Sequence, residues 1–130
     1  MSRRRVVVTG LGCISPAGNT VGVAWANLLA GKSGIGLITK FDASTFNCKI
    51  AGEVKGFDIE AYMSAKEART MDTFIHYGIA AAAQAVADAG LPTGEALSED
   101  EACRIAWVIG SGIGGLPMIE TVHAEYVQRG

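Results

Sequence analysis

Two short stretches of the chain are almost continuously apolar, and each ends at a glycine. Arg5–Gly10 reads R-V-V-V-T-G, and Arg104–Ile109 reads R-I-A-W-V-I before Gly110. Short apolar, β-branched runs that stop at a turn residue are typical of strands covered on both faces. The pattern therefore predicts two central strands, and a weaker signal indicates a third, short strand in Lys49–Val54.

Two segments outside the middle of the chain have helical character. After a loop rich in glycine, apolar residues recur at the i, i+3, i+4, i+7 spacing within Val21–Leu29. Asn19 or Thr20 can cap this helix, and Gly31 ends it. Leu116–Gln128 predicts a further helix.

Asp72–Ala89 predicts the clearest helix. Its apolar positions step by three and four, while His76, Gln84 and Asp88 fall on another face. Most of its remaining residues are glycine or alanine, and Gly90 follows its end. A helix with so little side-chain bulk can be approached closely from several directions, which suits a helix packed inside a layered fold.

The connections carry mixed signals. Gly34 and Gly36 indicate turns, Phe41–Phe46 an irregular loop, and Thr93–Glu101 an acidic exposed connection. Ile59–Ala65 is a possible short helix before a polar stretch. Since strands alternate with helices, the predicted fold class is α/β.

Composition excludes several classes of protein. Hydrophobic residues make up 49% of the 130 residues and charged residues 18%, so disorder is not expected. A net charge of −2 argues against a broad nucleic-acid-binding face. No apolar run reaches the roughly 18 residues of a membrane span. Cys13, Cys48 and Cys103 lack metal-ligand spacing and a disulfide pattern, so we expect no metal site and a reducing, cytoplasmic location.

The glycine turn after the second predicted strand is the first candidate site. Gly110, Gly112 and Gly115 satisfy G-x-G-x-x-G between a strand and a helix, the position of a dinucleotide site. That fingerprint also needs an acidic residue at the end of a second strand, about twenty positions on. No such strand follows, so a structural turn with positive φ angles stays open beside nucleotide binding.

The remaining polar candidates have simple structural explanations. His76 and His123 have no carboxylate at ligand spacing, and packing or surface roles are favoured for both. Each cysteine is more typical of a small buried hydrophobe than of a nucleophile. Lys66 and Arg69 share a helix face if their stretch is helical, either as a solvated face or as a docking patch for an acidic partner.

Four motifs occur in order along the chain. They are R-R-V-V-V-T-G-L-G-x-x-S-P-x-G-N at Arg4–Asn19, G-K-S-G-I at Gly31–Ile35, M-D-T-F at Met71–Phe74 and G-S-G-I-G-G at Gly110–Gly115. Together they resemble the beginning of bacterial 3-oxoacyl-acyl-carrier-protein synthases of type II, the elongating condensing enzymes of fatty acid synthesis. Type I synthases resemble the chain less, because they tend to lack the S-P-x-G-N loop and the isoleucine of the glycine turn.

The resemblance implies the thiolase-like fold, in which two similar α/β halves with mixed five-stranded sheets form layers, and the enzyme is a homodimer. Residues 1–130 would be the amino-terminal part of the first half, with the remainder of the synthase absent. This explains why the predicted strands do not complete a sheet.

The resemblance also implies decarboxylative condensation of malonyl-acyl carrier protein with an acyl-enzyme thioester. The family uses a cysteine in a T-A-C context and two histidines in H-G-T-G-T and G-H-x-x-G-A contexts. None of the cysteines or histidines here has those neighbours, so no catalytic residue is expected in this chain and the chain alone should be inactive.

Family features do match at three positions. Ile113 corresponds to an isoleucine that lines and gates the acyl-chain pocket, and Lys66 and Arg69 correspond to basic residues that contact acyl carrier protein. A third basic position of that patch is Thr70 here. We expect no cofactor, with a Rossmann-type dinucleotide-binding module or a noncatalytic ketosynthase-like partner subunit as the alternatives.

Overall fold

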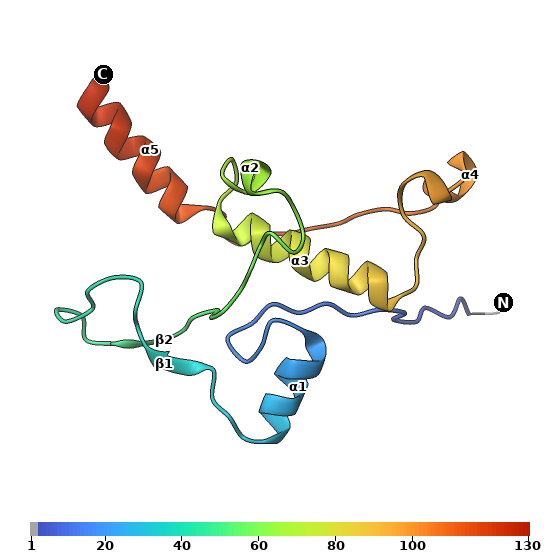
Figure 1. The fold of residues 1–130 in the computed structure, drawn as a ribbon, viewed down its shortest axis with the longest axis horizontal. Coiled ribbons are helices and arrows are strands. Elements are labelled where there is room, and N and C mark those ends of the chain that lie inside the picture. Colours follow the sequence, from blue (N-terminus) through green and yellow to red (C-terminus); the bar gives the residue numbers. More distant parts are fainter. Residues whose placement is uncertain (1–2) are drawn as a thin grey trace. The chain divides into compact units, whose positions relative to one another are not determined.

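The computed structural model describes residues 3–130, apart from the side chain of Glu95. The chain divides into two units, one made of residues up to Asp58 with Ala80–Leu91, the other of Ile59–Ile79 with Pro92–Gly130. Figure 1 shows the elements in order: α1 (Val21–Leu29), β1 (Ile35–Leu37), β2 (Ile50–Gly52), α2 (Ala65–Ala68), α3 (Thr73–Asp88), the 3₁₀ turn η1 (Gly94–Ala96), α4 (Glu99–Ala102) and α5 (Leu116–Arg129).

Helix α1 begins and ends where the sequence predicts. The Thr20 hydroxyl accepts a hydrogen bond from the N–H of Val23 over 3.3 Å, so Thr20 is the N-cap. Gly31, just after the helix, has a φ of +65°, a left-handed conformation that glycine adopts without strain. The loop before α1 is held to the helix by the Asn27 amide, which donates to the Ala17 carbonyl over 2.7 Å.

Strands β1 and β2 form an antiparallel pair in the first unit, with Gly36 opposite Ala51. The short strand predicted in Lys49–Val54 is confirmed, whereas the turn predicted at Gly36 is wrong because this glycine lies inside β1. The loop that joins the strands is irregular, as predicted, and is closed by an edge-to-face contact of Phe41 with Phe46, whose ring centroids are 5.5 Å apart.

Glu53, which follows β2, binds the start of that loop. Its carboxylate accepts from the N–H of Thr39 over 2.9 Å, from the Thr39 hydroxyl over 2.6 Å and from the N–H of Lys40 over 3.2 Å. The side chain is buried, and the hydrogen bonds from Thr39 hold the pKa of the Glu53 carboxyl below its usual range.

The second half of α3 lies directly against the backbone of the first loop. The N–H of Leu11 donates to Asp88 Oδ2 over 2.9 Å, and the N–H of Cys13 donates to Gln84 Oε1 over 3.2 Å. Residues two apart in an extended chain are separated by about 6.6 Å, and residues four apart in a helix by about 6 Å, so the two spacings match. The polar face of this helix therefore binds the first loop.

Small residues on both sides make this approach possible. A Cβ at Gly10 would lie 2.7 Å from the Cβ of Ala89, and a Cβ at Gly12 would lie 2.9 Å from the backbone nitrogen of Ala85. Ala80, on the same half of the helix, has no exposed surface. The prediction that this alanine-rich helix admits close neighbours is confirmed.

The second unit begins with a short turn and helix α2. The predicted helix over Ile59–Ala65 is wrong, because Ile59–Met63 forms turns and the helix begins at Ala65. Ser64 and Glu67 make a reciprocal capping box, which fixes the start of α2. The exposed connection predicted over Thr93–Glu101 is confirmed. It contains η1 and the start of α4, each of which forms about one helical turn.

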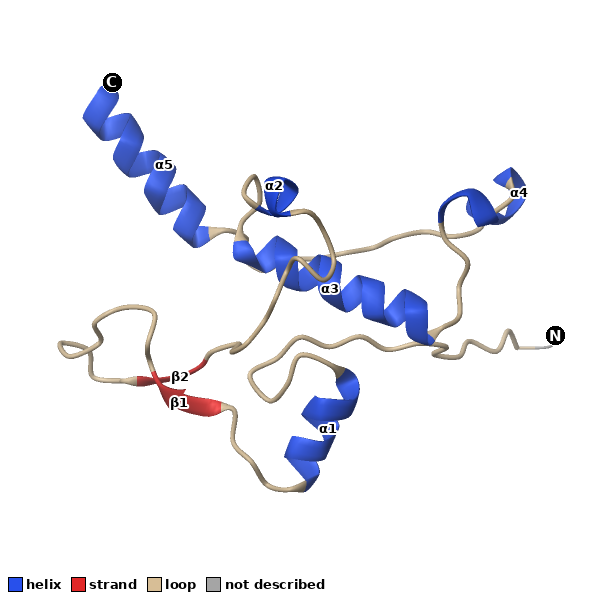
Figure 2. Ribbon diagram, viewed as in Figure 1, coloured by secondary structure: helices blue, strands red, loops and turns tan. Residues whose placement is uncertain are grey.

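The two short apolar runs do not form strands. Arg5–Gly10 and Arg104–Ile109 are without regular structure in the part of the chain that is described, and Figure 2 draws both as loop. Val6 is 93% exposed and Val108 94% exposed, so the predicted burial of these runs is also wrong. A strand obtains its hydrogen bonds from a neighbouring strand, and neither run has one among residues 3–130.

Candidate functional site

The candidate site is the glycine turn Gly110–Gly115, which leads into α5. Gly114 has a φ of +82°, which favours glycine, and a Cβ at Gly115 would meet the carboxylate of Asp72, which would have to move aside. A Cβ at Gly110 or Gly112 would meet nothing within 4 Å. The structural requirement for glycine therefore falls at the end of the turn, and does not follow the G-x-G-x-x-G spacing.

Asp72 is a residue of this site that the sequence reasoning missed. It lies immediately before α3, where its Oδ1 accepts from the N–H of Thr73 over 2.6 Å, and its Oδ2 accepts from the N–H of Met118 over 3.1 Å. An aspartate ahead of a strong helix is a recognisable capping signal. The hydrogen bond to Met118, 46 residues away along the chain, could not be predicted from the local sequence pattern.

Ile113 lies in the turn with 76% of its surface exposed. Next to the turn, a groove of about 340 Å³ runs between the first half of α3 and the segment that leads into the turn. The structure thus places Ile113 beside an apolar groove, but does not place its side chain among the lining residues. Those residues are Phe74, Ile75, Gly78, Ile79, Ile109, Gly110 and Ser111.

Lys66 and Arg69 lie at the second helical position and the C-cap of α2, and both side chains are exposed. Neither makes an ion pair within residues 3–130, where the recorded salt bridge joins Arg129 to Glu125. The intervening Glu67 is engaged locally, because Ser64 donates hydrogen bonds to its carboxylate from both its hydroxyl and its N–H. These bonds lower the pKa of the Glu67 carboxyl.

Two residues, His76 and Thr70, make hydrogen bonds to the backbone of α2. The Nε2 of His76, on α3, donates to the Ala68 carbonyl over 2.9 Å, so this histidine has the packing role that was favoured. Thr70, at the third position of the proposed basic patch, donates its hydroxyl to the Glu67 carbonyl over 2.7 Å. Thr70 therefore completes the last turn of α2 and adds no charge.

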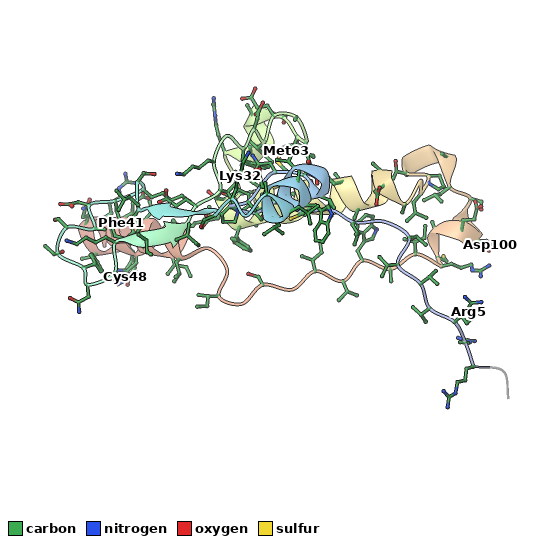
Figure 3. The ribbon with its side chains drawn as sticks, turned by 90° about the horizontal axis from the view of Figure 1, so that it is seen from below. Arg5, Lys32, Phe41, Cys48, Met63 and Asp100 are labelled. Atoms are coloured by element: carbon green, nitrogen blue, oxygen red, sulfur yellow. The ribbon has the colours of Figure 1, made fainter. Side chains whose placement is uncertain are left out.

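The cysteines and the second histidine are not gathered into a site. Cys13 is half-buried, whereas Cys48 and Cys103 are exposed, so the prediction of buried cysteines is wrong for the latter two. Cys48 lies in the loop of the β1–β2 pair with Phe41, where Figure 3 labels both. His123 is exposed on α5. Over residues 3–130, no cluster of three or more His, Cys, Asp or Glu has the arrangement of a metal site.

None of the helices within residues 3–130 combines the length and the apolar character that crossing a bilayer requires. The long connections and the short helices of the second unit, including α2 and α4, are visible in Figure 1. In the second unit, candidate chemistry is carried by the glycine turn and by the exposed basic pair of α2.

Residues 3–129 match the family described as "Beta-ketoacyl synthase, N-terminal domain". Because the match covers nearly the whole chain, this chain belongs to the beta-ketoacyl synthase family. The family resemblance drawn from the four ordered motifs is confirmed, and the assignment favours a condensing-enzyme interpretation of the glycine turn over a dinucleotide-binding module.

Several curated relatives share one name. The chain is 56% identical over 130 residues to "3-oxoacyl-[acyl-carrier-protein] synthase 2" of Vibrio cholerae, and the match covers 100% of this chain and 30% of the relative. It is 45% identical over 130 residues to the protein of that name from Synechocystis, again with 100% and 30% covered. The chain therefore spans about a third of the length of these relatives.

A solved structure supports the fold. "The ishigamide ketosynthase/chain length factor" is similar with a TM-score of 0.63 and 40% sequence identity over 77% of this chain and 23% of that chain. Together with the family match, this similarity supports a thiolase-like fold for a chain that contains both helices and a short sheet.

Proposed function

We propose that residues 1–130 form the amino-terminal part of the first thiolase-like half of a 3-oxoacyl-acyl-carrier-protein synthase. The observation that carries this proposal is the alignment of the whole chain with relatives of that name, at 56% identity for the first of them. The complete protein would contain mixed five-stranded sheets arranged in layers, act as a homodimer, and work in the cytoplasm.

The exposed apolar surface supports the existence of further chain. The apolar runs leave Val7 and Ile109 each 68% exposed and Val108 94% exposed. In the proposed synthase these runs become central strands, paired and covered by parts of the protein outside residues 1–130.

The proposed reaction has three steps. A cysteine thiolate attacks the thioester of an acyl carrier protein, taking the acyl group and releasing the carrier thiol. Malonyl-acyl carrier protein then loses carbon dioxide, and the electron pair left on carbon attacks the acyl-cysteine thioester. The cysteine leaves as thiolate, and the product is a 3-oxoacyl group on the carrier protein. The cysteine and the histidines for these steps lie outside this chain.

This chain contributes two parts of the site. Ile113 would bound the acyl chain, because it is an apolar residue on a turn that borders an apolar groove. Apolar contact is the interaction that a saturated acyl chain can make, and it requires no charged residue in the turn.

Lys66 and Arg69 would dock the acyl carrier protein. They are exposed, carry like charge on one short helix, and have no ion-pair partner within residues 3–130. A free basic pair of this kind attracts an acidic partner and speeds its association at low ionic strength. Because the third position is Thr70, the patch relies on these two charges.

The similarity to a protein titled "The ishigamide ketosynthase/chain length factor" supports one second candidate. A noncatalytic ketosynthase-like partner subunit would keep the fold and the docking surface but lack the nucleophile. The residue in the T-A-C position of the complete protein separates the two candidates.

The decisive experiment incubates the complete protein with acyl- and malonyl-loaded carrier protein and follows the carrier by mass spectrometry. The proposal predicts a 3-oxoacyl carrier protein two carbons longer than the starting acyl chain, with loss of carbon dioxide. A folded protein that binds the carrier without forming this product would support the partner-subunit candidate instead.

A further inference from the structure

The carboxylate of Asp72 accepts hydrogen bonds from the first turns of two helices in the second unit. Asp72 Oδ1 accepts from Thr73, the first residue of α3, and Asp72 Oδ2 accepts from Met118, the third residue of α5. The N-terminus of a helix carries partial positive charge and unpaired N–H groups, so a carboxylate shared by two such ends is favourable at both.

Helix α5 lacks the means to cap itself. Its N-cap is Gly115, which has no side chain and makes no side-chain cap hydrogen bond, and its second residue is Pro117, which has no N–H. Met118 is therefore the third helical residue and the one whose N–H a conventional cap would bind. Asp72 supplies the missing acceptor from outside the helix.

The end of the glycine turn is shaped around this carboxylate. A Cβ at Gly115 would contact Asp72 Oδ2 and would lie 2.9 Å from its Cγ. Gly114, with a φ of +82°, turns the chain immediately after Ile113. Ile113 is thus two residues from a position that is packed against Asp72 and five residues from the N–H that Asp72 binds.

We propose that Asp72 is a positioning residue for the acyl-pocket turn: it fixes the start of α5 and the last two glycines, and thereby the placement of Ile113. The inference rests on the proposed function of Ile113. Asp72 touches no substrate in this role; it acts through the backbone of the turn.

The first test measures the link itself, by amide hydrogen exchange in the complete protein. In the Asp72→Ala variant the carboxylate is gone, so the N–H groups of Thr73 and Met118 both lose their acceptor. We expect exchange at Met118 to rise about fivefold, the size of losing one helix cap. Asp42→Ala is the matched control, since Asp42 accepts only local hydrogen bonds, from Ser44.

The second test measures chain-length selectivity. We expect Asp72→Ala to shift the ratio of kcat/KM for hexanoyl- and hexadecanoyl-carrier protein about fivefold towards unity, because a loosened turn no longer holds Ile113 in one place. A purely structural role would lower kcat/KM for both substrates by the same factor and leave the ratio unchanged.

A second variant, Gly115→Ala, distinguishes the positioning role from a simple loss of folding. Gly115→Ala places a methyl group against the Asp72 carboxylate, so it should shift the same ratio. In the Asp72→Ala background this carboxylate is gone, and Gly115→Ala should change the ratio by less than about twofold, a non-additivity expected for residues in contact.

The outcomes separate the two ideas. A protein that condenses normally but shows an unchanged ratio in Asp72→Ala, or additive effects in the double variant, overturns the positioning role alone. Exchange at Met118 that matches that of the Asp42→Ala control overturns the cap. If the unaltered protein forms no 3-oxoacyl product, the proposed function fails, whatever the exchange at Met118 shows.

Discussion

Gly12→Ala tests the contact between the first loop and α3. At most exposed positions this exchange stabilises a protein by about 0.4–1 kcal/mol, because alanine restricts the unfolded chain. Gly12 has no positive φ that would oppose alanine, so the conformational term alone predicts a gain. Packing predicts the opposite, since the new methyl group would lie 2.8 Å from the Ala81 carbonyl carbon and in contact with its oxygen.

The packing term should be the larger one. The atoms in the way belong to the backbone of α3, which cannot rotate aside as a side chain can, and overfilling a packed site costs about 1–3 kcal/mol. Displacing the loop also weakens the bond from the N–H of Cys13 to Gln84, at 3.2 Å, which is worth about 1 kcal/mol. The net expectation is a destabilisation of about 1–3 kcal/mol after the conformational gain is subtracted.

Urea unfolding of the complete protein measures this difference. With a slope of about 1–3 kcal/mol per molar urea, the midpoint should fall by roughly 1 M. Gly22→Ala is the control, because Gly22 lies in α1 and a Cβ there meets nothing within 4 Å. It should leave the midpoint equal or slightly raised. A Gly12→Ala protein as stable as the Gly22→Ala protein would refute the account of this contact.

Three further predictions concern charge, pH and ligand. The double variant Lys66→Glu/Arg69→Glu should weaken carrier-protein binding at low salt, whereas the control Lys49→Glu should leave it unchanged. Equal binding by the double variant and the control would remove the docking role. The Glu53 carboxyl has a lowered pKa in the folded state, so its stabilisation is present above its usual pKa of about 4.3 and is lost as the pH falls below it. Glu53→Gln should flatten the decline of the unfolding midpoint in that range, and an unchanged decline would contradict this. Micromolar NADH should leave Trp107 fluorescence unquenched, whereas saturable quenching would revive nucleotide binding.

The longer helices α1 and α3 were predictable from the sequence because their determinants are local. The Thr20 cap, the glycine at position 31 and the three-and-four spacing of α3 each act within one or two turns, and the structure reproduces their consequences. Strands depend on partners distant in sequence. The apolar runs Arg5–Gly10 and Arg104–Ile109 have strand composition, yet they remain without strand pairing among residues 3–130.

The candidate site was predictable in part. The glycine turn and the basic pair of α2 could be recognised from motifs, because the residues that define each are adjacent in sequence. The role of Asp72 could not, because its second bond reaches Met118 across 46 residues. The contact of Gly115 with the Asp72 carboxylate could not be predicted from the glycine spacing. The G-x-G-x-x-G pattern offers a different explanation for the same glycine.

The proposed function depends most on assigning the Gly110–Gly115 turn to an acyl chain. The most direct test is the product chain-length profile of the complete protein carrying Ile113→Phe, with Ile35→Phe, an equally conservative change at an exposed strand position, as the control. A larger side chain at Ile113 should overfill the pocket and shorten the longest acyl chain accepted, while Ile35→Phe leaves the profile unchanged. An Ile113→Phe profile identical to that of the unaltered protein would contradict the assignment.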